Sequence, residues 1–394
     1  MEILFYRYNS ICEPAAISAF ESFGITVHTE ELEMHEKQAA PSACVKAVSG
    51  WILQKPLAFV FSINFFPAIS YTCERLKVPY VCWTVDSPVP ELFSAALQNT
   101  YNRVFLFDRA QYEFFSPINP PCIHYLPLAA DVKQFEKAVL SMTEADYAAY
   151  GAEVSFVGSL YTEKCRYDSL ILSDHTKGYV DGLMEAQLRV YGYNLIADAL
   201  TDSVIREIMD ADPQRYRGED LREGVERYLT AHQYIGMKLA SLERERTLQR
   251  LSDHFPVTLY TRSDASFLPR VDCRGGVRTL TEMPKVFQAS RINLNMTMRP
   301  IETGLSQRIW DVLACGGFLL TNYQSEIPDY FEIGKDLETY ESMEELEEKV
   351  RYYLVHEEER VEIAINGYEK VAAHHTYEIR LSQMIKILTD NMPS

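Results

Sequence analysis

The chain has 394 residues, and its 38 Lys and Arg residues against 56 Asp and Glu residues give a formal net charge of −18. This length predicts two domains rather than a single core. The acidic balance argues against a nucleic acid or an anionic membrane as the main partner, so an anionic ligand would need a local basic pocket. Apolar residues make up 47% of the chain, which is ordinary for a soluble protein, and the apolar runs are shorter than a membrane span.

The eight cysteines are scattered without Cys-x-x-Cys pairs or metal-ligand spacing, which predicts reduced thiols packed in a core. The N-terminal MEILFYRY is strand-like and lacks a signal-peptide pattern, so we expect a cytoplasmic protein. Asp210-Ala211-Asp212 resembles a metal-binding Asp-x-Asp motif, but it lies in a helical stretch and we interpret it as chance. The sequence therefore predicts no metal site.

Residues 1–131 predict a parallel α/β domain, in which apolar strand patterns alternate with helical ones. We expect its strands at residues 3–6, 25–27, 57–62, 80–85, 104–107 and 123–126. The first turn, Arg7-Tyr8-Asn9-Ser10, contains no glycine. A dinucleotide-binding Rossmann turn carries Gly-x-Gly-x-x-Gly at this place, so the sequence disfavours a dehydrogenase.

Residues 132–394 predict a second α/β domain after a short connection. Strand patterns at 154–157 and 257–260 are separated by a charged, periodic, glycine-poor stretch, which indicates a helical insertion at about 165–251. The tail at 341–390 is helical, and it opens with a capping box.

The most informative stretch, residues 292–322, predicts a strand, a loop, a helix and a second strand. Alternation over 292–297 indicates the first strand, and an apolar stripe over 305–313 indicates the helix. Gly316-Gly317 can take the left-handed conformation that ends a helix. The loop and the helix N-terminus then open at the carboxyl end of the strand, where α/β sheets bind ligands and where a helix favours phosphate.

Arg308 and Asp311 lie three residues apart, on one face of that helix. A guanidinium there can bind phosphate oxygens in a fork, and a carboxylate can accept from two vicinal hydroxyls. A nucleoside diphosphate would satisfy both side chains. A surface salt bridge within the helix is the alternative, and the spacing leaves both interpretations open.

Two domains of this kind, joined by a short connection, point to the GT-B architecture of glycosyltransferases, in which two Rossmann-like domains face a cleft, although a fold does not fix a function. The sequence also resembles the CgeB-like (spore maturation protein B-like) glycosyltransferases of the GT-B superfamily. The resemblance covers nearly the whole chain and rests on GLSQRIWDVLACGGFLLTNYQSEIPDYFEIGKD at 304–336, YYLVHEEER and HHTYEIR in the tail, and FYRYNSICEP, FSINFFPAIS, WTVDSPVPELFS, RVFLFDRAQYEFF and HYLPLAADV in the first half.

The resemblance implies that the second domain binds a nucleotide-diphospho-sugar and that the first presents the acceptor. Asp311 then matches the residue that binds ribose, and Arg308 is a basic neighbour of the diphosphate. The residues expected around the diphosphate and the base are Gly158, Ser159, Lys164, Arg278, Gly304, Leu305, Ser306 and Gln307. Arg278 falls where relatives hold the base by backbone contacts, and Lys164 is a phosphate cation or a structural residue.

Many retaining GT-B enzymes carry two acidic residues eight positions apart, the second matching Asp311. Here the first position is Thr303, and Glu302 is out of step by one. The contact to the sugar ring therefore stays open, as does the stereochemical class, although the resemblance favours a retaining enzyme.

Glycosyl transfer requires stabilisation of the leaving diphosphate, which we assign to Arg308, Lys164 and the N–H groups of 304–306. Fixed cations and a helix N-terminus can replace a metal, so we expect no cofactor. Asp86, which follows the fourth strand, is the candidate proton acceptor. Its alternative role is to cap the turn at Ser87-Pro88, and a retaining enzyme can work without a base.

Arg7, Tyr8 and Asn9 follow the first strand and are candidates for contact with the sugar or the acceptor. The sequence thus predicts a metal-independent glycosyltransferase that moves a sugar from a nucleotide diphosphate, with UDP favoured, to a protein or glycan acceptor. Two alternatives remain: another GT-B enzyme such as a nucleotide-sugar epimerase, and a non-catalytic protein that binds a nucleotide-sugar or acts as a scaffold.

Overall fold

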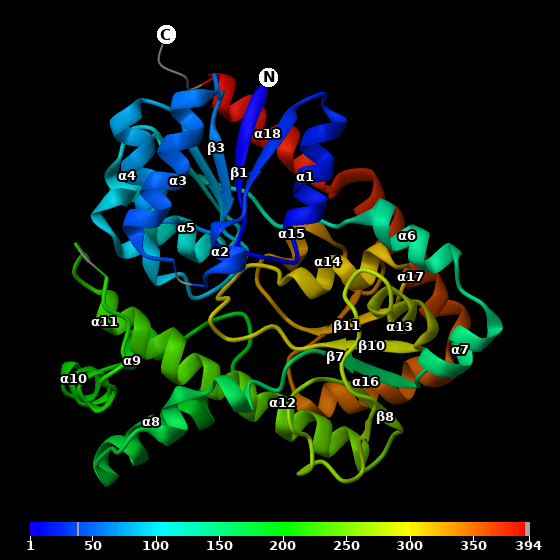
Figure 1. Ribbon diagram of the computed structural model, residues 1–394. Coiled ribbons are helices and arrows are strands. Elements are labelled where there is room, and N and C mark those ends of the chain that lie inside the picture. The colour runs from blue at the N-terminus through cyan, green and yellow to red at the C-terminus, as the bar shows by residue number, and fades with distance from the viewer. Residues whose placement is uncertain (38, 219, 391–394) are drawn as a thin grey trace. The chain divides into compact units, whose positions relative to one another are not determined.

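The computed structural model describes residues 1–37, 39–218 and 220–390, and it contains two six-stranded parallel sheets flanked by helices (Figure 1). The α/β class and the predicted pair of sheets are thereby confirmed. The chain divides into two compact units. Unit 1 contains Met1–Leu128, Tyr216–Val225 and the segment from Tyr377 onward, and unit 2 contains Ala129–Arg215 and Glu226–Thr376. The predicted boundaries, 1–131 and 132–394, lack the two later segments that return to unit 1.

Unit 1 is built on a sheet with the strand order β2-β1-β3-β4-β5-β6, in which all neighbours are parallel. Its strands are β1 (Glu2–Tyr6), β2 (Thr26–Glu30), β3 (Val60–Ile63), β4 (Tyr80–Trp83), β5 (Asn102–Leu106) and β6 (Ile123–Tyr125). Its helices are α1 (Glu13–Ser22), α2 (Leu32–His35), α3 (Pro41–Gln54), α4 (Pro67–Leu76), α5 (Arg109–Phe115) and α18 (Tyr377–Asp390), with short 3-10 turns η1 (Pro90–Phe93), η2 (Ala95–Gln98) and η3 (Ser116–Ile118). Figure 1 shows α1 and α18 on one side of this sheet and α3 and α4 on the other.

The last helix of the tail, α18, packs in unit 1, whereas the sequence placed it in the second domain. The Tyr377 ring meets Trp83 of β4 edge to face at 5.8 Å, and Arg380 Nε donates to the carbonyl oxygen of Leu128 at 3.2 Å. The insertion also contributes to this unit: Arg222 N donates to Phe93 O at 2.9 Å. These contacts explain why both segments group with the first sheet.

Unit 2 is built on a sheet with the strand order β12-β11-β10-β7-β8-β9, again parallel throughout. Its strands are β7 (Val154–Val157), β8 (Val257–Tyr260), β9 (Asp272–Cys273), β10 (Ile292–Asn295), β11 (Leu319–Asn322) and β12 (Glu338–Tyr340). Outside the insertion, its helices are α6 (Val132–Leu140), α7 (Glu144–Tyr150), α13 (Met283–Ala289), α14 (Gln307–Ala314), α15 (Ile327–Tyr330), α16 (Met343–Val355) and α17 (Glu357–His374).

The predicted helical insertion lies between β7 and β8. It consists of η4 (Thr162–Lys164), η5 (Arg166–Ser169), α8 (Asp174–Gln187), α9 (Ile196–Ala199), α10 (Asp202–Ala211), α11 (Val225–Tyr228), the π-helix η6 (Leu229–Gly236) and α12 (Met237–Ser252). The last helix, α12, packs on the sheet: Leu248 and Leu251 join a buried cluster with β7, β8, β10 and α16. Figure 1 shows α12 and α16 on one side of this sheet and α13 and α14 on the other.

The helix α14, which carries the candidate site, is held at its C-terminus and along its length. Gly316 ends it with φ of 67°, as the sequence predicted. Along its length it packs against α17, where Gly367 allows a close approach: a Cβ at that position would lie 2.2 Å from Asp336 O and 2.8 Å from Leu313 Cδ2.

Replacing Gly367 with Ala should therefore lower the free energy of unfolding by about 1–3 kcal/mol, because neither the backbone oxygen nor the packed leucine can move aside freely. The matched control is Gly182→Ala in α8, where no atom lies within 4 Å of the added Cβ. That change should raise stability by about 0.5–1 kcal/mol through the lost flexibility of glycine. Urea denaturation of both variants measures the difference, and equal stabilities would contradict the packing described.

Candidate nucleotide-binding site

A polar network beneath the N-terminus of α14 links the carboxyl ends of β10 and β11. Asn295 Nδ2 donates to Thr321 Oγ1 at 2.9 Å and to Thr297 Oγ1 at 3.1 Å. Thr297 N donates to Asn322 Oδ1 at 2.8 Å, and the hydroxyls of Thr297 and Ser306 lie 3.2 Å apart. Because the Ser306 hydroxyl is used there, the N-cap of α14 makes no side-chain hydrogen bond to the helix. A first turn without a side-chain cap is the arrangement in which helix N–H groups bind an anion.

The loop before α14 is held by two buried side chains that follow β11. Gln324 Nε2 donates to the carbonyl oxygens of Ile301 and Gly304, each at 3.2 Å. The Thr303 hydroxyl donates to Glu326 Oε1 at 2.6 Å, and Glu326 is only 2% exposed. An acid in place of Thr303 would face the carboxylate of Glu326, so the contacts of this loop suit a hydroxyl at position 303. Glu302 instead lies 3.3 Å from Nε2 of the buried His232.

Arg308 and Asp311 form the salt bridge that their spacing allows, with Arg308 Nη1 to Asp311 Oδ2 at 3.1 Å. The Asp311 side chain is 5% exposed and that of Arg308 is 24% exposed, so neither points into bulk solvent. Gln307 Nε2 donates to Asp311 Oδ1 at 2.9 Å and to Ala129 O at 2.8 Å. Arg308 Nη1 also contacts the sulfur of Met283.

Burial disfavours the charged forms of both Asp311 and Arg308. Burial raises the pKa of Asp311, while the Arg308 charge and the Gln307 hydrogen bond act in the opposite direction. Burial likewise lowers the pKa of Arg308, opposed by the Asp311 charge. Groups whose burial works against their charged forms are frequent in functional sites, although ion-pair networks also produce them.

The edge of β7 carries the predicted glycine turn. Gly158 N donates to Tyr260 O at 3.1 Å, and the Ser159 hydroxyl donates to Glu163 Oε1 at 2.8 Å. Tyr161 follows with a left-handed φ of 63°, and its ring lies 5.4 Å from the ammonium of the exposed Lys164. Ser159 and Lys164 therefore lie in the loop after β7, and their contacts with phosphate stay a prediction.

Arg244 also reaches this edge, and the sequence did not indicate it. It belongs to α12 and donates to the carbonyl oxygens of Ser159 after β7 and of Met296 after β10. Its guanidinium carbon lies 4.3 Å from the centre of the Tyr161 ring. In the sequence Arg244 lies in the charged run Glu243-Arg244-Glu245-Arg246, which is typical of an exposed helix face.

Arg278 lies on the surface before α13, with its side chain 75% exposed and paired with Glu282. Its N–H donates to Glu282 Oε2 at 2.7 Å, and its carbonyl oxygen accepts from Glu282 N and Met283 N, each at 3.0 Å. Both backbone groups therefore have partners within their own turn. Base recognition by this backbone, as the resemblance implied, would require the turn to open.

In unit 1, the candidate Asp86 is joined by a residue that the sequence analysis did not single out. Asn64 follows β3 with a left-handed φ of 58°, and its Nδ2 donates to Asp86 Oδ2 at 2.6 Å and to the Tyr8 hydroxyl oxygen at 2.8 Å. Its Oδ1 accepts from Val85 N at 3.0 Å. Burial, with a smaller effect of the Asp86 charge, raises the pKa of Tyr8 far above its usual value. An exposed carboxylate is thus held by a neutral tyrosine and an amide at the carboxyl ends of β1, β3 and β4.

Arg7 lies beside this cluster, but its contacts are internal to the protein. Its Nε lies 3.1 Å from the fully buried Glu13 and its Nη1 lies 2.8 Å from Glu31. Glu13 also accepts from the N–H groups of Tyr8 at 2.8 Å and of Ser10 at 3.0 Å, so the pair shapes the loop between β1 and α1. Asn9 is exposed on that loop, with φ of 73°.

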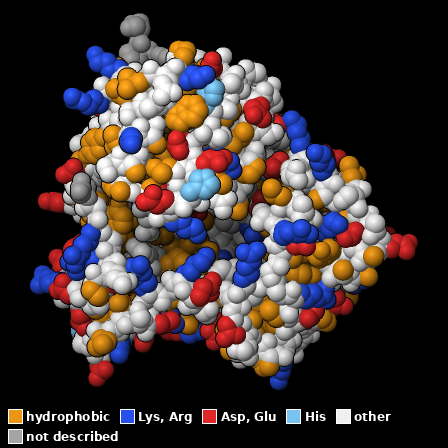
Figure 2. Space-filling model, in the orientation of Figure 1, with side chains coloured by type: hydrophobic (Ala, Val, Ile, Leu, Met, Phe, Trp, Pro, Cys, Tyr) orange, Lys and Arg blue, Asp and Glu red, His pale blue; other side chains and the backbone are white. Residues whose placement is uncertain are grey.

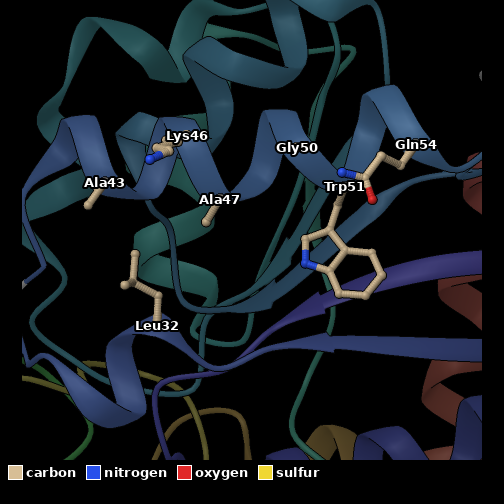
Figure 3. Close-up of a pocket in the computed structure, with 7 residues that line it drawn as sticks. All are labelled: Leu32, Ala43, Lys46, Ala47, Gly50, Trp51 and Gln54. Atoms are coloured by element: carbon tan, nitrogen blue, oxygen red, sulfur yellow. The ribbon is translucent and has the colours of Figure 1, made fainter.

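A hollow of about 450 Å³ lies elsewhere on unit 1, along α3 (Figure 3). Figure 3 shows Ala43, Ala47 and Trp51 along the helix, with Leu32 of α2 across from them. Its lining is largely apolar, with Lys46 and Gln54 as the polar side chains, and it includes none of the predicted site residues. It offers little to hold a diphosphate, so we place the candidate site at the strand ends instead.

Charged side chains of both signs are interspersed over the face that Figure 2 shows, which fits local anion binding better than a broad basic surface. In the described part of the chain, no group of three or more His, Cys, Asp or Glu side chains is placed to hold a metal ion. Asp212 of the Asp-x-Asp triplet accepts from the Tyr234 hydroxyl at 2.6 Å and from Arg166 Nη1 at 3.3 Å. None of the described helices has both the length and the apolar character that crossing a membrane requires.

The two parallel sheets, with the site elements at their carboxyl edges, define a protein of the GT-B architecture. Residues 243–386 match the family model described as "Glycosyl transferase-like". The fold is similar to that of HepE from Anabaena, solved with UDP and glucose, at a TM-score of 0.55 and 12% identity, covering 99% of this chain and 100% of that chain. No protein among the curated sequences matches the chain.

Two further solved structures share the fold. Sucrose-phosphate synthase from Thermosynechococcus elongatus matches at a TM-score of 0.55 and 12% identity over 99% of this chain and 98% of that one. The UDP-forming α,α-trehalose-phosphate synthase from Burkholderia xenovorans matches at 0.56 and 9% identity over 100% and 99%. At these identities the likeness confirms the GT-B fold, while the finer resemblance to CgeB-like proteins stays a prediction.

Proposed function

We propose that this protein is a glycosyltransferase that moves a sugar from a nucleotide diphosphate, with UDP as the nucleotide, to a protein or glycan acceptor. The observation that carries the proposal is the N-terminus of α14, which has no side-chain cap and lies one turn from the buried Asp311. The glycosyltransferase-like match includes this helix. HepE, which has the same fold, was solved with UDP-glucose, and this supports UDP as the nucleotide.

Each residue of the donor site has a distinct part in this proposal. The N–H groups of Gly304, Leu305 and Ser306 bind the diphosphate at the start of α14, and the carboxylate of Asp311 accepts from the ribose hydroxyls. Gln307 holds the carboxylate in place through its 2.9 Å hydrogen bond. Arg308 is then shared between Asp311 and the phosphate oxygens.

The edge of β7 completes the donor site. Gly158 and Ser159 form the turn beside the diphosphate, and the exposed Lys164 supplies a cation at its rim. These fixed charges supply what a divalent cation supplies in other transferases, so the proposed reaction is metal-independent. Arg278 and the backbone near it are assigned to the base once their turn opens.

Unit 1 is assigned to the acceptor. Asp86 removes the proton from the acceptor hydroxyl in an inverting reaction, and Tyr8, Asn9 and Asn64 contact the acceptor or the sugar beside it. In a retaining reaction, which the resemblance favours, the leaving phosphate accepts the proton and Asp86 positions the acceptor. Arg7 has a structural part here, because its guanidinium is already paired with Glu13 and Glu31. A cytoplasmic location is part of the same proposal.

A non-catalytic protein that binds a nucleotide-sugar is the second candidate, because Thr303 and its partner Glu326 stand where relatives place an acid near the sugar. An epimerase of the same fold is the third. The three differ in what happens to the donor: a transferase consumes it faster with an acceptor, an epimerase converts it without one, and a binding protein leaves it intact.

The test is incubation of the protein with a panel of UDP-, GDP- and ADP-sugars, with and without peptide and oligosaccharide acceptors, followed by chromatography of the nucleotides. The proposal predicts release of UDP from one sugar donor, slowly by hydrolysis and faster with the right acceptor. A C4 or C2 epimer of the donor with no free UDP would identify an epimerase. Binding of UDP-sugars without any turnover across the panel would favour the binding protein.

A further inference from the structure

The guanidinium of Arg244 is buried without a compensating negative charge. The residue is 7% exposed, and no carboxylate among the described residues lies within salt-bridge distance of it. Two of its five N–H groups donate to Ser159 O and Met296 O, and its buried Nε has no partner in the described part of the chain. A buried charge without a counter-ion costs several kcal/mol in real proteins, so this arrangement needs a reason.

A second buried arginine in the same region has a carboxylate as its counter-ion, which is the usual arrangement for a buried charge. Arg299 is as buried as Arg244, but it lies 2.8 Å from the carboxylate of Glu243, the residue next to Arg244 on α12. Glu243 is therefore committed to Arg299. The protein satisfies one of the two cations with its own carboxylate and leaves the other without one.

Among the described residues, Arg244 is held in place without using a carboxylate, unlike Arg308, and it is buried, unlike Lys164. It joins the strand ends of β7 and β10 through two carbonyl oxygens, and it packs on the ring of Tyr161, whose hydroxyl lies 3.4 Å from Met298 Sδ. Lys164 is exposed, and Arg308 is paired with Asp311. The positive charge of Arg244 further lowers the pKa of Arg308, in addition to the larger effect of burial, so the two guanidinium groups are close enough for their charges to interact.

We propose that Arg244 binds the diphosphate of the donor and stabilises the negative charge that develops on it as the sugar leaves. The inference rests on the proposed function and deepens it: the helical insertion supplies a cation of the donor site through its last helix. The ligand class is a diphosphate monoester or diester, and the anion provides the counter-charge that the protein lacks.

In the reaction, the bond between the anomeric carbon and the diphosphate oxygen breaks, and its electron pair stays on the diphosphate. The acceptor oxygen forms the new bond to the anomeric carbon, and the acceptor proton leaves to Asp86 or to the departing diphosphate. Arg244 neither gives nor takes a proton, because a guanidinium stays protonated in this range. Its N–H groups are already oriented by two carbonyl oxygens, so they need no reorganisation when the charge develops.

The test compares Arg244→Met with Arg246→Met, a control on the same helix whose guanidinium is about half exposed and paired with Glu185. Calorimetry at a temperature where both variants are folded by circular dichroism measures the affinities for UDP and for inorganic pyrophosphate, and NMR titration measures that for uridine. We expect Arg244→Met to bind UDP and pyrophosphate at least tenfold more weakly with uridine unchanged, and Arg246→Met to match the wild type.

Two results would overturn the inference. One is an unchanged affinity of Arg244→Met for UDP and pyrophosphate. The other is an equal loss for uridine and UDP, which would mean that Arg244 only holds the strand ends together. If Arg244→Met does not fold, Arg244→Lys takes its place. This variant keeps the positive charge but loses the fork of guanidinium N–H groups, and it is judged by the same ratio of UDP to uridine affinity.

The donor proposal and the Arg244 inference fail in different ways. Wild-type protein that binds UDP, together with an Arg244→Met variant that binds it equally well, leaves the proposed function in place and removes Arg244 from the site. Wild-type protein that binds pyrophosphate through Arg244 but no nucleotide in the panel would refute the donor proposal and keep the anion site.

Discussion

Replacing Asp311 with Asn should lower the affinity for UDP and its sugar conjugates by about 10- to 100-fold. Hydrogen bonds to a charged group contribute about 1.5–3 kcal/mol, and each 1.4 kcal/mol corresponds to a factor of ten. The side chain is 5% exposed and held by Gln307, so it does not need to be ordered by the ligand. Calorimetric titration with UDP measures the loss.

A nucleotide that lacks a ribose hydroxyl separates this contact from general damage to the site. Wild-type protein should bind 2′-deoxy-UDP more weakly than UDP. In Asp311→Asn this preference should shrink, because the amide keeps one acceptor oxygen but loses the carboxylate charge that strengthens the hydrogen bond. The matched control is Glu332→Gln, which removes the charge from an exposed salt bridge with Lys335 at the same three-residue spacing. A preference for UDP over 2′-deoxy-UDP that is undiminished in Asp311→Asn would remove Asp311 from the ribose site.

The choice of Asn over Ala matters for stability. An alanine at 311 leaves the guanidinium of Arg308 without its salt bridge, and breaking a fully buried pair in this way costs about 3–5 kcal/mol. Arg308 is 24% exposed, so the cost here should fall below that range. The Asn side chain keeps an oxygen that can accept from Arg308, and the folded state should be preserved.

Replacing Asp86 with Asn should lower the turnover number by about 10²- to 10⁴-fold if this carboxylate removes the acceptor proton. Donor affinity should not change, because Asp86 contacts Tyr8 and Asn64 of unit 1 rather than the donor site of unit 2. Steady-state rates with saturating UDP-sugar and varied acceptor separate the two parameters.

Glu31→Gln is the control for this change, because Glu31 lies at the same edge of the sheet and is paired with Arg7. It should leave turnover within about twofold of the wild type. A turnover of Asp86→Asn close to the wild-type value would contradict the base assignment and would favour the retaining route, in which the departing phosphate takes the proton.

The sheet strands were largely predictable from the sequence because most of them are buried on both faces. Val154–Val157 and Val257–Tyr260 are short, largely apolar runs with one buried hydroxyl residue each, and both form strands at the predicted residues. Glu338–Tyr340 forms β12 although its sequence, Glu-Thr-Tyr, does not have the apolar pattern of a buried strand. Its glutamate is buried, and the pattern could not show that Lys349 and the Tyr353 hydroxyl would meet that carboxylate at 2.7 and 2.9 Å.

The rest of the fold could not be predicted from the sequence, because it depends on packing between residues that are far apart in the chain. The amphipathic pattern of α18 predicts a helix but not the sheet on which it packs, which is decided by contacts such as those of Tyr377 with Trp83 and of Arg380 with Leu128. In the candidate site too, residues with local partners were predictable and residues with distant partners were not. Arg308 and Asp311 were visible because their spacing is local. The Arg244 side chain reaches its partners across at least 52 residues and that of Asn64 across at least 21, and neither residue lies in a distinctive motif.

A crystal structure of the protein with UDP tests the central claim most directly. The account predicts the ribose hydroxyls of UDP within about 2.6–3.2 Å of the Asp311 carboxylate and the diphosphate against the N–H groups of residues 304–306. UDP bound elsewhere, for example in the hollow along α3, with Asp311 in contact only with Arg308 and Gln307, would contradict it.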